Sequence, residues 1–508
     1  MKGFPVILGF HVCLLTVTPF IPAAVPISDA TAECLECHAS IHPGIVKDWE
    51  NSRHAMITPK EAMAAKGPAL KVSSPLVPES LQNVAVGCAE CHNMRPEAHA
   101  DTFEHNGYNV HVVVSPTDCA TCHAEEAEQY GNNIMAHAWK NLAENKIYQA
   151  LQQAIIGRPV LKDHSVIFEA ADAGTRADAC FYCHGTKLKV TGTEARETDM
   201  GAMVFPRISG WPNQGVGRIN PDGSLGACSA CHTRHAFSIA MARKPHTCKE
   251  CHAGPDVPAF KVYSASKHGN IYAAMHKKWN FEPVPWTAGE DFTAPTCAAC
   301  HISLLVNTDG EVINRRTHRM NDRLSWRIFG LTYAHPHPKE PDTTVIRNRA
   351  GWQLPTDMDG EFASDFLIAK EEQEKRTVTM QATCLSCHDR SWVQGHWRKY
   401  ENTIRQTNAA TRTANDLMGK IWENGFALGP DRDGNPFDEA VEKTWTDIWL
   451  FYGNTVRFAS AMAGGGDYGV FADGRYYLAK RIQELSDWLK LRKSLPHPTT
   501  QTGQEKDE

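Results

Sequence analysis

Cysteine pairs of the form Cys-x-x-Cys, each followed at once by a histidine, recur eight times along the chain. They use sixteen of the seventeen cysteines, and the remaining one is Cys13. The cysteines of the eight motifs are Cys34, Cys37, Cys88, Cys91, Cys119, Cys122, Cys180, Cys183, Cys228, Cys231, Cys248, Cys251, Cys297, Cys300, Cys384 and Cys387. The histidines that follow them are His38, His92, His123, His184, His232, His252, His301 and His388.

This spacing is the attachment signature of c-type haem, in which two thiols bond one edge of the porphyrin and the adjoining histidine binds the iron. Zinc sites, thioredoxin-like motifs and disulfide frameworks also use paired cysteines. None of these alternatives explains why a histidine follows every second cysteine. The sequence therefore predicts eight covalently bound haem c groups, with the eight motif histidines as iron ligands.

Histidines are also abundant outside the motifs. The chain has 25, and setting aside the eight in the motifs together with His11 and His497 near the ends leaves fifteen. A buried haem iron that only transfers electrons usually takes a second strong protein ligand. The surplus exceeds the seven or eight histidines needed as second ligands, so a purely electron-transferring protein with every iron doubly ligated stays an alternative.

The elements that must hold these groups change character near residue 390. Before it the chain is irregular and rich in Gly, Pro and Asn, with short helices expected at the motifs and one alternating strand pattern at 108–114. After it, apolar residues recur at helical spacing in three long segments. We predict a mainly α multihaem cytochrome c fold wrapped around eight haems, in which little β structure occurs and a bundle of three long C-terminal helices follows. The predicted parts are a signal peptide at 1–30, a haem-binding catalytic domain at 31–390, a C-terminal helical domain at 391–494 and a disordered tail at 495–508.

The N-terminus has the pattern of an export signal: Lys2 precedes an apolar run, and small residues suited to cleavage follow near Ala24 or Ala30. Haem c is attached outside the cytoplasm, so we expect a periplasmic protein, with an uncleaved membrane anchor as the alternative. The formal net charge of −6 and ordinary aromatic content of 9% give no footprint for nucleic acid and favour a positively charged redox partner.

Several longer strings resemble the octahaem hydroxylamine oxidoreductase family over most of the mature chain. They are "CSACHTRHAFSIAMARKPHTCKECHAGPD", "SKHGNIYAAMHKKWNF", "APTCAACH" and "THRMNDRLSW", and "GWPNQGVGRINPDGSLGACSACH" is similar to members thought to work reductively. The resemblance implies a homotrimer, and it implies second iron ligands at His54, His111, His137, His235, His268 and His318. A seventh is left open among His42, His164 and His396.

The resemblance further implies that the fourth haem is catalytic, with an open iron position, a proximal ligand at His184 and attachment at Cys180 and Cys183. Oxidising members have an Asp-His pair above this iron, whereas here Asp256 is followed by Val257. Asp256 can still relay protons. The alternative for Asp256 is an exposed loop acid.

Tyr468, in "GGGDYGVFADGRYY", is the candidate for the tyrosine that, in oxidising members, reaches from a neighbouring subunit and cross-links to the catalytic haem. We expect an oxidoreductase acting on small nitrogen compounds, with a preference for reducing nitrite or hydroxylamine to ammonium. The alternatives are oxidation of hydroxylamine or hydrazine, with electrons leaving to a cytochrome or a membrane quinone-linked carrier, reduction of peroxide or sulfur oxyanions, and the non-catalytic electron conduit.

Overall fold

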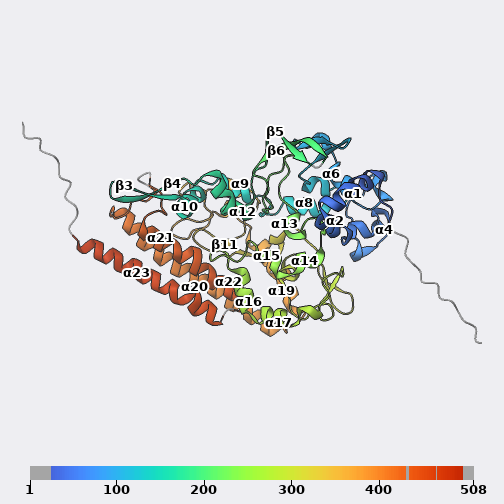
Figure 1. The fold of residues 1–508 in the computed structure, drawn as a ribbon. Helices are drawn as coiled ribbons and strands as arrows, with labels where there is room; N and C mark the ends of the chain where they lie inside the picture. Colours follow the sequence, from blue (N-terminus) through green and yellow to red (C-terminus); the bar gives the residue numbers. More distant parts are fainter. Residues whose placement is uncertain (1–24, 199, 431–433, 465, 496–508) are drawn as a thin grey trace, which may run out of the picture.

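The computed structural model describes residues 25–495 except 199, 431–433 and 465 (Figure 1). Most of the predicted signal segment, including Cys13 and Ala24, and the tail from residue 496 lie outside the described residues. Ala30 lies in the first helix, α1 (Asp29–Ile41). Among the described residues, no helix combines the length and apolar character required to cross a bilayer.

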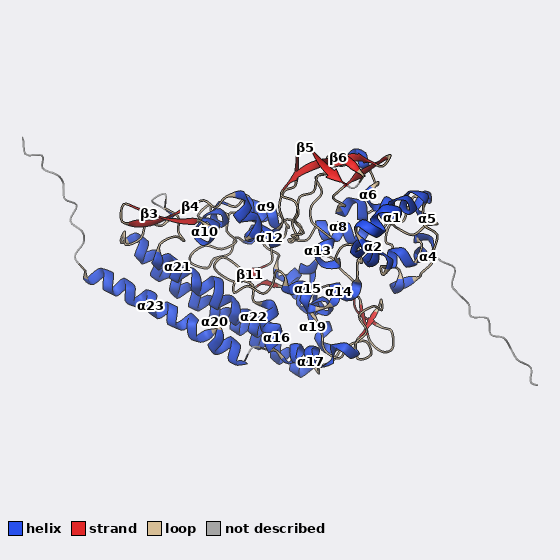
Figure 2. Cartoon of the chain, in the orientation of Figure 1, coloured by secondary structure: helices blue, strands red, loops and turns tan. Residues whose placement is uncertain are grey.

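Short helices dominate the region before residue 390 (Figure 2). They are α2 (Pro43–Glu50), α3 (Arg53–Met56), α4 (Pro59–Met63), α5 (Glu79–Gln82), α6 (Cys88–His92), α7 (Pro116–Cys119), α8 (Ala124–Gly131), α9 (Ala138–Ala143), α10 (Lys146–Ile156), α11 (Ala173–Asp178), α12 (Cys180–His184), α13 (Ser229–His232), α14 (Ile239–Arg243), α15 (Pro245–Lys249), α16 (Ala259–Ala265), α17 (Lys267–Met275), α18 (Cys297–His301) and α19 (Lys370–Leu385). The 3₁₀ turns are η1 (Gly67–Ala69), η2 (Pro96–Ala98), η3 (His276–Lys278), η4 (Met320–Arg323), η5 (Thr343–Val345) and η6 (Ser364–Phe366).

Local capping explains why such short helices form. The Ser115 side chain accepts from the backbone N–H of Asp118, whose carboxylate in turn accepts from the Ser115 N–H, and Pro116 occupies the first helical position of α7. Thr58 and Glu61 form the same reciprocal arrangement at α4. Each cap satisfies N–H groups that a single helical turn leaves without partners. Polar caps therefore fix the chain around the motifs where apolar periodicity is weak.

Strands form small sheets of two or three strands, and the β3–β4 and β5–β6 hairpins lie at the periphery (Figure 2). The pairs are β1 (Thr102–His105) with β2 (Tyr108–His111), β3 (Arg158–Lys162) with β4 (Ser165–Glu169), β5 (Lys189–Thr198) with β6 (Gly201–Ser209), and β10 (Trp326–Arg327) with β11 (His335–Pro336); β7 (Trp286–Thr287), β8 (Leu305–Val306) and β9 (Val312–Asn314) form the remaining sheet. The pattern at 108–114 contributes β2, whereas the two longer hairpins, β3–β4 and β5–β6, had no clear alternation in the sequence.

Long helices follow the last motif and lie side by side (Figure 1). They are α20 (Arg390–Glu423), the continuous run α21 (Ala440–Thr446), π-helical η8 (Asp447–Tyr452) and α22 (Gly453–Ala461), and α23 (Arg475–Ser494), with the π-helical turn η9 (Tyr468–Ala472) before α23. Asp389 caps α20 by accepting from the N–H groups of Ser391 and Trp392. The buried faces share one apolar core with Leu331 and Leu354 of the preceding region. This shared core fixes the helices against the motif-bearing part of the chain.

Candidate haem-binding and catalytic site

Each Cys-x-x-Cys-His motif folds as one tight turn. In α6, α12 and α18 the motif itself is the helix. Elsewhere the histidine N–H donates to the carbonyl of the first cysteine, as at His232 (3.1 Å) and His388 (2.9 Å). The sixteen described cysteines are all free of disulfides. The turn brings two thiols and an imidazole to the same part of the chain, as a thioether-linked porphyrin requires.

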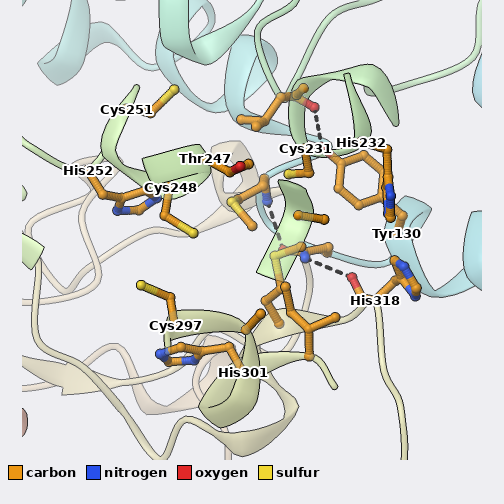
Figure 3. Close-up of a pocket in the computed structure, with 18 of the residues that line it drawn as sticks. Tyr130, Cys231, His232, Thr247, Cys248, Cys251, His252, Cys297, His301 and His318 are labelled. Carbon is orange, nitrogen blue, oxygen red and sulfur yellow. Dashed lines mark hydrogen bonds between the residues drawn. The ribbon is translucent and has the colours of Figure 1, made fainter. Parts of the chain in front are cut away.

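The second to eighth motifs line one continuous cavity of about 2630 Å³. Its wall carries the cysteines of the second to eighth motifs in part or in full and many histidines. Figure 3 shows Cys248, Cys251 and His252 facing Cys297 and His301 across this space, with His232 and His318 beside Tyr130. A cavity of this size with so many thiols and imidazoles fits several large cofactors.

Thiols of different motifs are close neighbours. Cys119 and Cys228, Cys183 and Cys251, and Cys248 and Cys297 lie close enough to shift one another's pKa, which places the third motif beside the fifth, the fourth beside the sixth and the sixth beside the seventh. Burial, and then the neighbouring thiol of Cys384, raises the pKa of Cys300 to about 12. Cys248 likewise acts on Cys231 of the fifth motif. The third to eighth attachment points therefore form a connected series, with the fourth motif beside the sixth.

Five pairs of imidazoles stand at the separation expected of two ligands on one iron. Metal to imidazole nitrogen bonds of about 2 Å place two such ring centroids about 6 Å apart. The separations are 6.1 Å for His38 and His105, 6.0 Å for His92 and His111, 6.2 Å for His123 and His54, 6.4 Å for His232 and His318, and 6.2 Å for His388 and His268. Four of these partners, His54, His111, His318 and His268, are among the predicted second ligands.

His235, also predicted, lines the cavity and is close enough to His92 for the two charges to interact. Burial lowers the pKa of His54, His235 and His318 to about 4. Their imidazoles are therefore neutral at physiological pH. A neutral ring has the free lone pair that a metal ligand requires.

His111 stays a prediction as a second ligand. Its ring centroid lies 6.0 Å from that of the motif histidine His92. Its ring nitrogens also face the carbonyl oxygens of Met94 (2.9 Å) and Val113 (3.2 Å), and its ring stacks on His99 at 3.7 Å. Its own carbonyl accepts from Nδ1 of His92 and orients that motif imidazole. His105, on the partner strand of the same hairpin, lies opposite another motif histidine, His38.

His137 stays a prediction. Its Nε2 lies 3.0 Å from the carbonyl oxygen of Gly131, so this nitrogen donates, and its Nδ1 is buried without a hydrogen-bond partner. Among the recorded ring contacts of the described residues, none pairs His137 with a motif histidine.

His337 was missed by the sequence reasoning. It is 5% exposed, lines the cavity, and lies close enough to His301 for the two charges to interact. The signal that could have found it is the run His-Pro-His-Pro at 335–338, a polar sequence that the fold nevertheless buries.

The three candidates for a seventh second ligand have other positions. His42 meets the motif histidine His38 through their Nδ1 atoms at 2.9 Å, which is an orienting contact. His164 is exposed in the turn between β3 and β4. His396 lines the cavity beyond Trp392, whose ring stacks on His388.

The fourth motif has a carboxylate beside its histidine. Burial lowers the pKa of His184, while a hydrogen bond with the backbone of Ala138 and the charge of Asp256 oppose this. Among the described residues, no second imidazole stands at iron-sharing ring distance from His184, and the same holds for His252 and His301. Asp256 lines the cavity near His184 and His252, and Val257 beside it lines the cavity too.

Asp256 is held from the C-terminal helices. The side-chain amide of Asn454, a fully buried residue of α22, donates to the backbone carbonyl of Asp256 at 2.9 Å. Asn454 also accepts from Nη1 of Arg457 (3.1 Å), which donates in addition to the carbonyl of Ile328 (3.0 Å). Sequence alone did not indicate Asn454 or Arg457.

Tyr468 lies elsewhere. Its hydroxyl donates to the Asp473 carboxylate at 3.2 Å within the same loop, and it is not part of the cavity wall. Burial and the neighbouring Asp473 raise the pKa of Tyr468 to about 12. Within this chain, therefore, Tyr468 and the fourth motif are not brought together.

The residues present fit a covalently attached iron porphyrin on the chemistry of the donor set: unpaired thiols, buried neutral imidazoles and a large enclosed space. Two family descriptions match parts of the chain, "Seven times multi-haem cytochrome CxxCH" at 223–326 and "Cytochrome c554 and c-prime" at 118–203. A solved structure called "Hypothetical multiheme protein" superposes with a TM-score of 0.87 at 39% identity, covering 93% of this chain and 97% of that one.

The chain belongs to the multihaem c-type cytochromes.

Two more distant similarities are to proteins of Kuenenia stuttgartiensis. This cytochrome is 27% identical over 376 residues to a "Probable nitrite reductase-hydroxylamine oxidoreductase fusion protein" of Kuenenia stuttgartiensis, which covers 72% of this chain and 34% of that protein. The cytochrome thus matches only about a third of that relative's length. The reducing HAO-like protein complex Kustc0457/Kustc0458 of Kuenenia stuttgartiensis shares the fold, with a TM-score of 0.61 at 17% identity over 91% of this chain and 85% of that one.

Proposed function

We propose that this cytochrome reduces nitrite or hydroxylamine to ammonium at the haem attached to Cys180 and Cys183. The observation that carries the proposal is the fourth motif itself: His184 has no second imidazole opposite it among the described residues, and a carboxylate, Asp256, lines the space beside it. The relatives named for nitrite reductase and hydroxylamine oxidoreductase support the choice of nitrogen substrates.

Nitrite takes up six electrons and eight protons to give ammonium and two waters, and hydroxylamine takes up two electrons and three protons to give ammonium and one water. The haem groups, when bound, supply electron storage and an open iron. The chain must supply protons at the reacting atom. Asp256 is the group for this role, since it is the carboxylate whose charge acts on His184, and Asn454 holds its backbone in place.

The remaining motifs serve as the electron path in this proposal. The eight haems are held by the sixteen cysteines and eight motif histidines, with second ligands from His54, His105, His235, His268, His318 and His337. The connected series of thiols supports transfer between neighbouring groups, because adjacent attachment points bring the porphyrins close together. Electrons would come from a small redox protein or a quinone-linked carrier in the periplasm, after removal of the N-terminal signal, and the assembly would be a homotrimer.

The sixth motif is the second candidate for the reacting site, because His252 also has no second imidazole at iron-sharing distance among the described residues. Hydroxylamine oxidation would instead require Tyr468 of a neighbouring subunit to join the fourth haem, since within its own chain its hydroxyl donates to Asp473 outside the cavity wall.

Electron paramagnetic resonance of the oxidised holoprotein tests the site, and ammonium production from each substrate, driven by dithionite-reduced viologen, tests the reaction. One high-spin haem that shifts on nitrite addition and is lost in a Cys180→Ala and Cys183→Ala double variant supports the fourth motif. An entirely low-spin spectrum together with no ammonium formation would contradict the proposal and indicate a protein that only transfers electrons.

A further inference from the structure

Arg327 is a cavity-lining arginine with unused hydrogen-bonding capacity. It lies on β10, in register with His335 on β11. Its Nε donates to the carbonyl of Phe329 at 3.1 Å, and its guanidinium lies 5.8 Å from the Phe329 ring centroid. Its two terminal nitrogens form no hydrogen bond or ion pair with another described residue. A guanidinium fixed through Nε presents its two terminal nitrogens as a fork toward an anion.

The helix α22 ties this arginine to the acid of the proposed site. Asn454 binds the carbonyl of Asp256 at 2.9 Å, and Arg457 binds both Asn454 at 3.1 Å and the carbonyl of Ile328 at 3.0 Å. Ile328 directly follows Arg327. The strand that carries Arg327 and the loop that carries Asp256 are therefore fastened to the same buried turn of α22.

Arg327 and Asp256 also carry the opposite charges that lie near the fourth motif. Both residues line the cavity, and both lie close enough to His184 for their charges to act on its imidazole. The cationic Arg327 and the anionic Asp256 are thus the two fixed charges of opposite sign that act on this imidazole. An anionic substrate approaching it is attracted by the first and repelled by the second.

We infer that Arg327 recognises the anionic substrate at the fourth motif, binding the two oxygens of nitrite with its terminal nitrogens. This assignment rests on the proposed function. Nitrite has the planar, two-oxygen form that a guanidinium fork binds bidentately in carboxylates. Hydroxylamine is neutral and gains nothing from the ion pair. Arg327 therefore sets the preference between the two substrates, whereas Asp256 serves both.

A haem propionate carries the same forked oxygens, so the experiment must separate the two sources of the anion. The variants are Arg327→Met and Arg327→Lys in the holoprotein, with Arg349→Met as the control. Arg349 is an exposed arginine paired with Asp359 outside the cavity wall. Haem content and circular dichroism establish that each variant is loaded and folded.

Two measurements follow. The first is an optical titration of the oxidised protein with sodium nitrite, and the second compares KM for nitrite and for hydroxylamine with viologen as electron donor. Arg327→Met is expected to weaken nitrite binding and raise the nitrite KM by about 10 to 100-fold, the loss typical of a charged hydrogen-bond partner. The hydroxylamine KM should stay within about twofold, Arg327→Lys should recover part of the nitrite affinity, and Arg349→Met should match the wild type.

The inference is overturned by equal losses for both substrates, or by unchanged nitrite affinity accompanied by a shift of haem potential in a redox titration, since the latter identifies a propionate as the partner. It is also overturned if the wild-type protein binds no nitrite. Nitrite binding that depends on Arg327 in a protein that forms no ammonium would instead uphold the anion site and remove the proposed reduction.

Discussion

Asn454 and Asp256 are joined by a 2.9 Å hydrogen bond that runs from a side chain of α22 to the backbone of the loop after the sixth motif. Asn454 is completely buried. The C-terminal helices therefore do more than cover the apolar core, since one of them fixes the position of the carboxylate assigned to proton delivery.

Replacing Asn454 by leucine should lower the turnover of nitrite and of hydroxylamine together, because the Asp256 loop loses its anchor. Leaving the buried carbonyl without a donor should also cost about 1–3 kcal/mol of stability. The matched control is Asn415→Leu, which removes buried hydrogen bonds to Thr332 and Tyr333 that do not involve the site. Turnover is compared under conditions in which both variants are equally far from their denaturation midpoints. If both variants lose turnover equally, the effect of Asn454→Leu comes from lower stability and not from the position of Asp256.

The Asp256→Asn variant should retain nitrite binding but lose about 10²–10⁴-fold in turnover, the usual contribution of a positioned proton donor. The pH dependence of kcat should flatten in the same variant. Glu250→Gln is the comparison, because Glu250 is an exposed carboxylate within the sixth motif, and its backbone carbonyl accepts from the thiol of Cys183. Unaltered turnover in Asp256→Asn would return this residue to the role of a loop acid.

Removing His337 should convert one haem from low spin to high spin, because the iron held by His301 loses its second ligand. The readout is electron paramagnetic resonance of His337→Gly, and added imidazole should restore the low-spin signal. His164→Gly, at an exposed hairpin turn, serves as the reference and should leave the spectrum unchanged. A His337→Gly spectrum identical to the reference would remove His337 from the set of ligands.

His99 should make folding stability depend on pH. Burial disfavours its charged form, but the carboxylate of Asp101 at 3.5 Å from Nδ1 and that of Asp118, which accepts from Nε2 at 3.1 Å, overcome this and raise the pKa of His99 from 6.5 to about 9. A group whose pKa is higher in the folded state stabilises it fully below its unfolded pKa, about 6.5, and this contribution disappears as the pH rises through about 9.

The denaturation midpoint of the wild type should therefore fall more steeply between pH 6.5 and 9 than that of His99→Gln, since the two proteins share every other titrating group. Parallel pH profiles for the two proteins would show that His99 is uncharged in the folded state.

Peptide mapping by mass spectrometry should find the Tyr468 peptide separate from the haem peptide of Cys180 and Cys183. The reason is structural: the Tyr468 hydroxyl is bound to Asp473 and is not part of the cavity wall of its own chain. A Tyr468 peptide joined to that haem peptide would instead require a second subunit to supply the tyrosine, and would favour oxidation over reduction.

Covalent chemistry explains why the sequence identified the attachment sites. A thioether-linked haem needs two thiols and an imidazole within five consecutive residues. This requirement is local, so the amino-acid sequence alone shows where it is met. Helix periodicity after residue 390 is equally local, because the apolar face of α20 recurs along a single element. His54, His268 and His318 are far from their partner motifs in sequence, and they were predicted as second ligands only through the family resemblance.

Second ligands and site-shaping residues depend on contacts between distant segments, and there the sequence left choices open. His105 and His111 occupy one hairpin, and only the fold places His105 opposite His38 and His111 opposite His92. His337 is buried by segments whose approach no local pattern encodes. Asn454 meets Asp256 across 198 residues of chain, because packing of α22 against the motif-bearing region brings the two together.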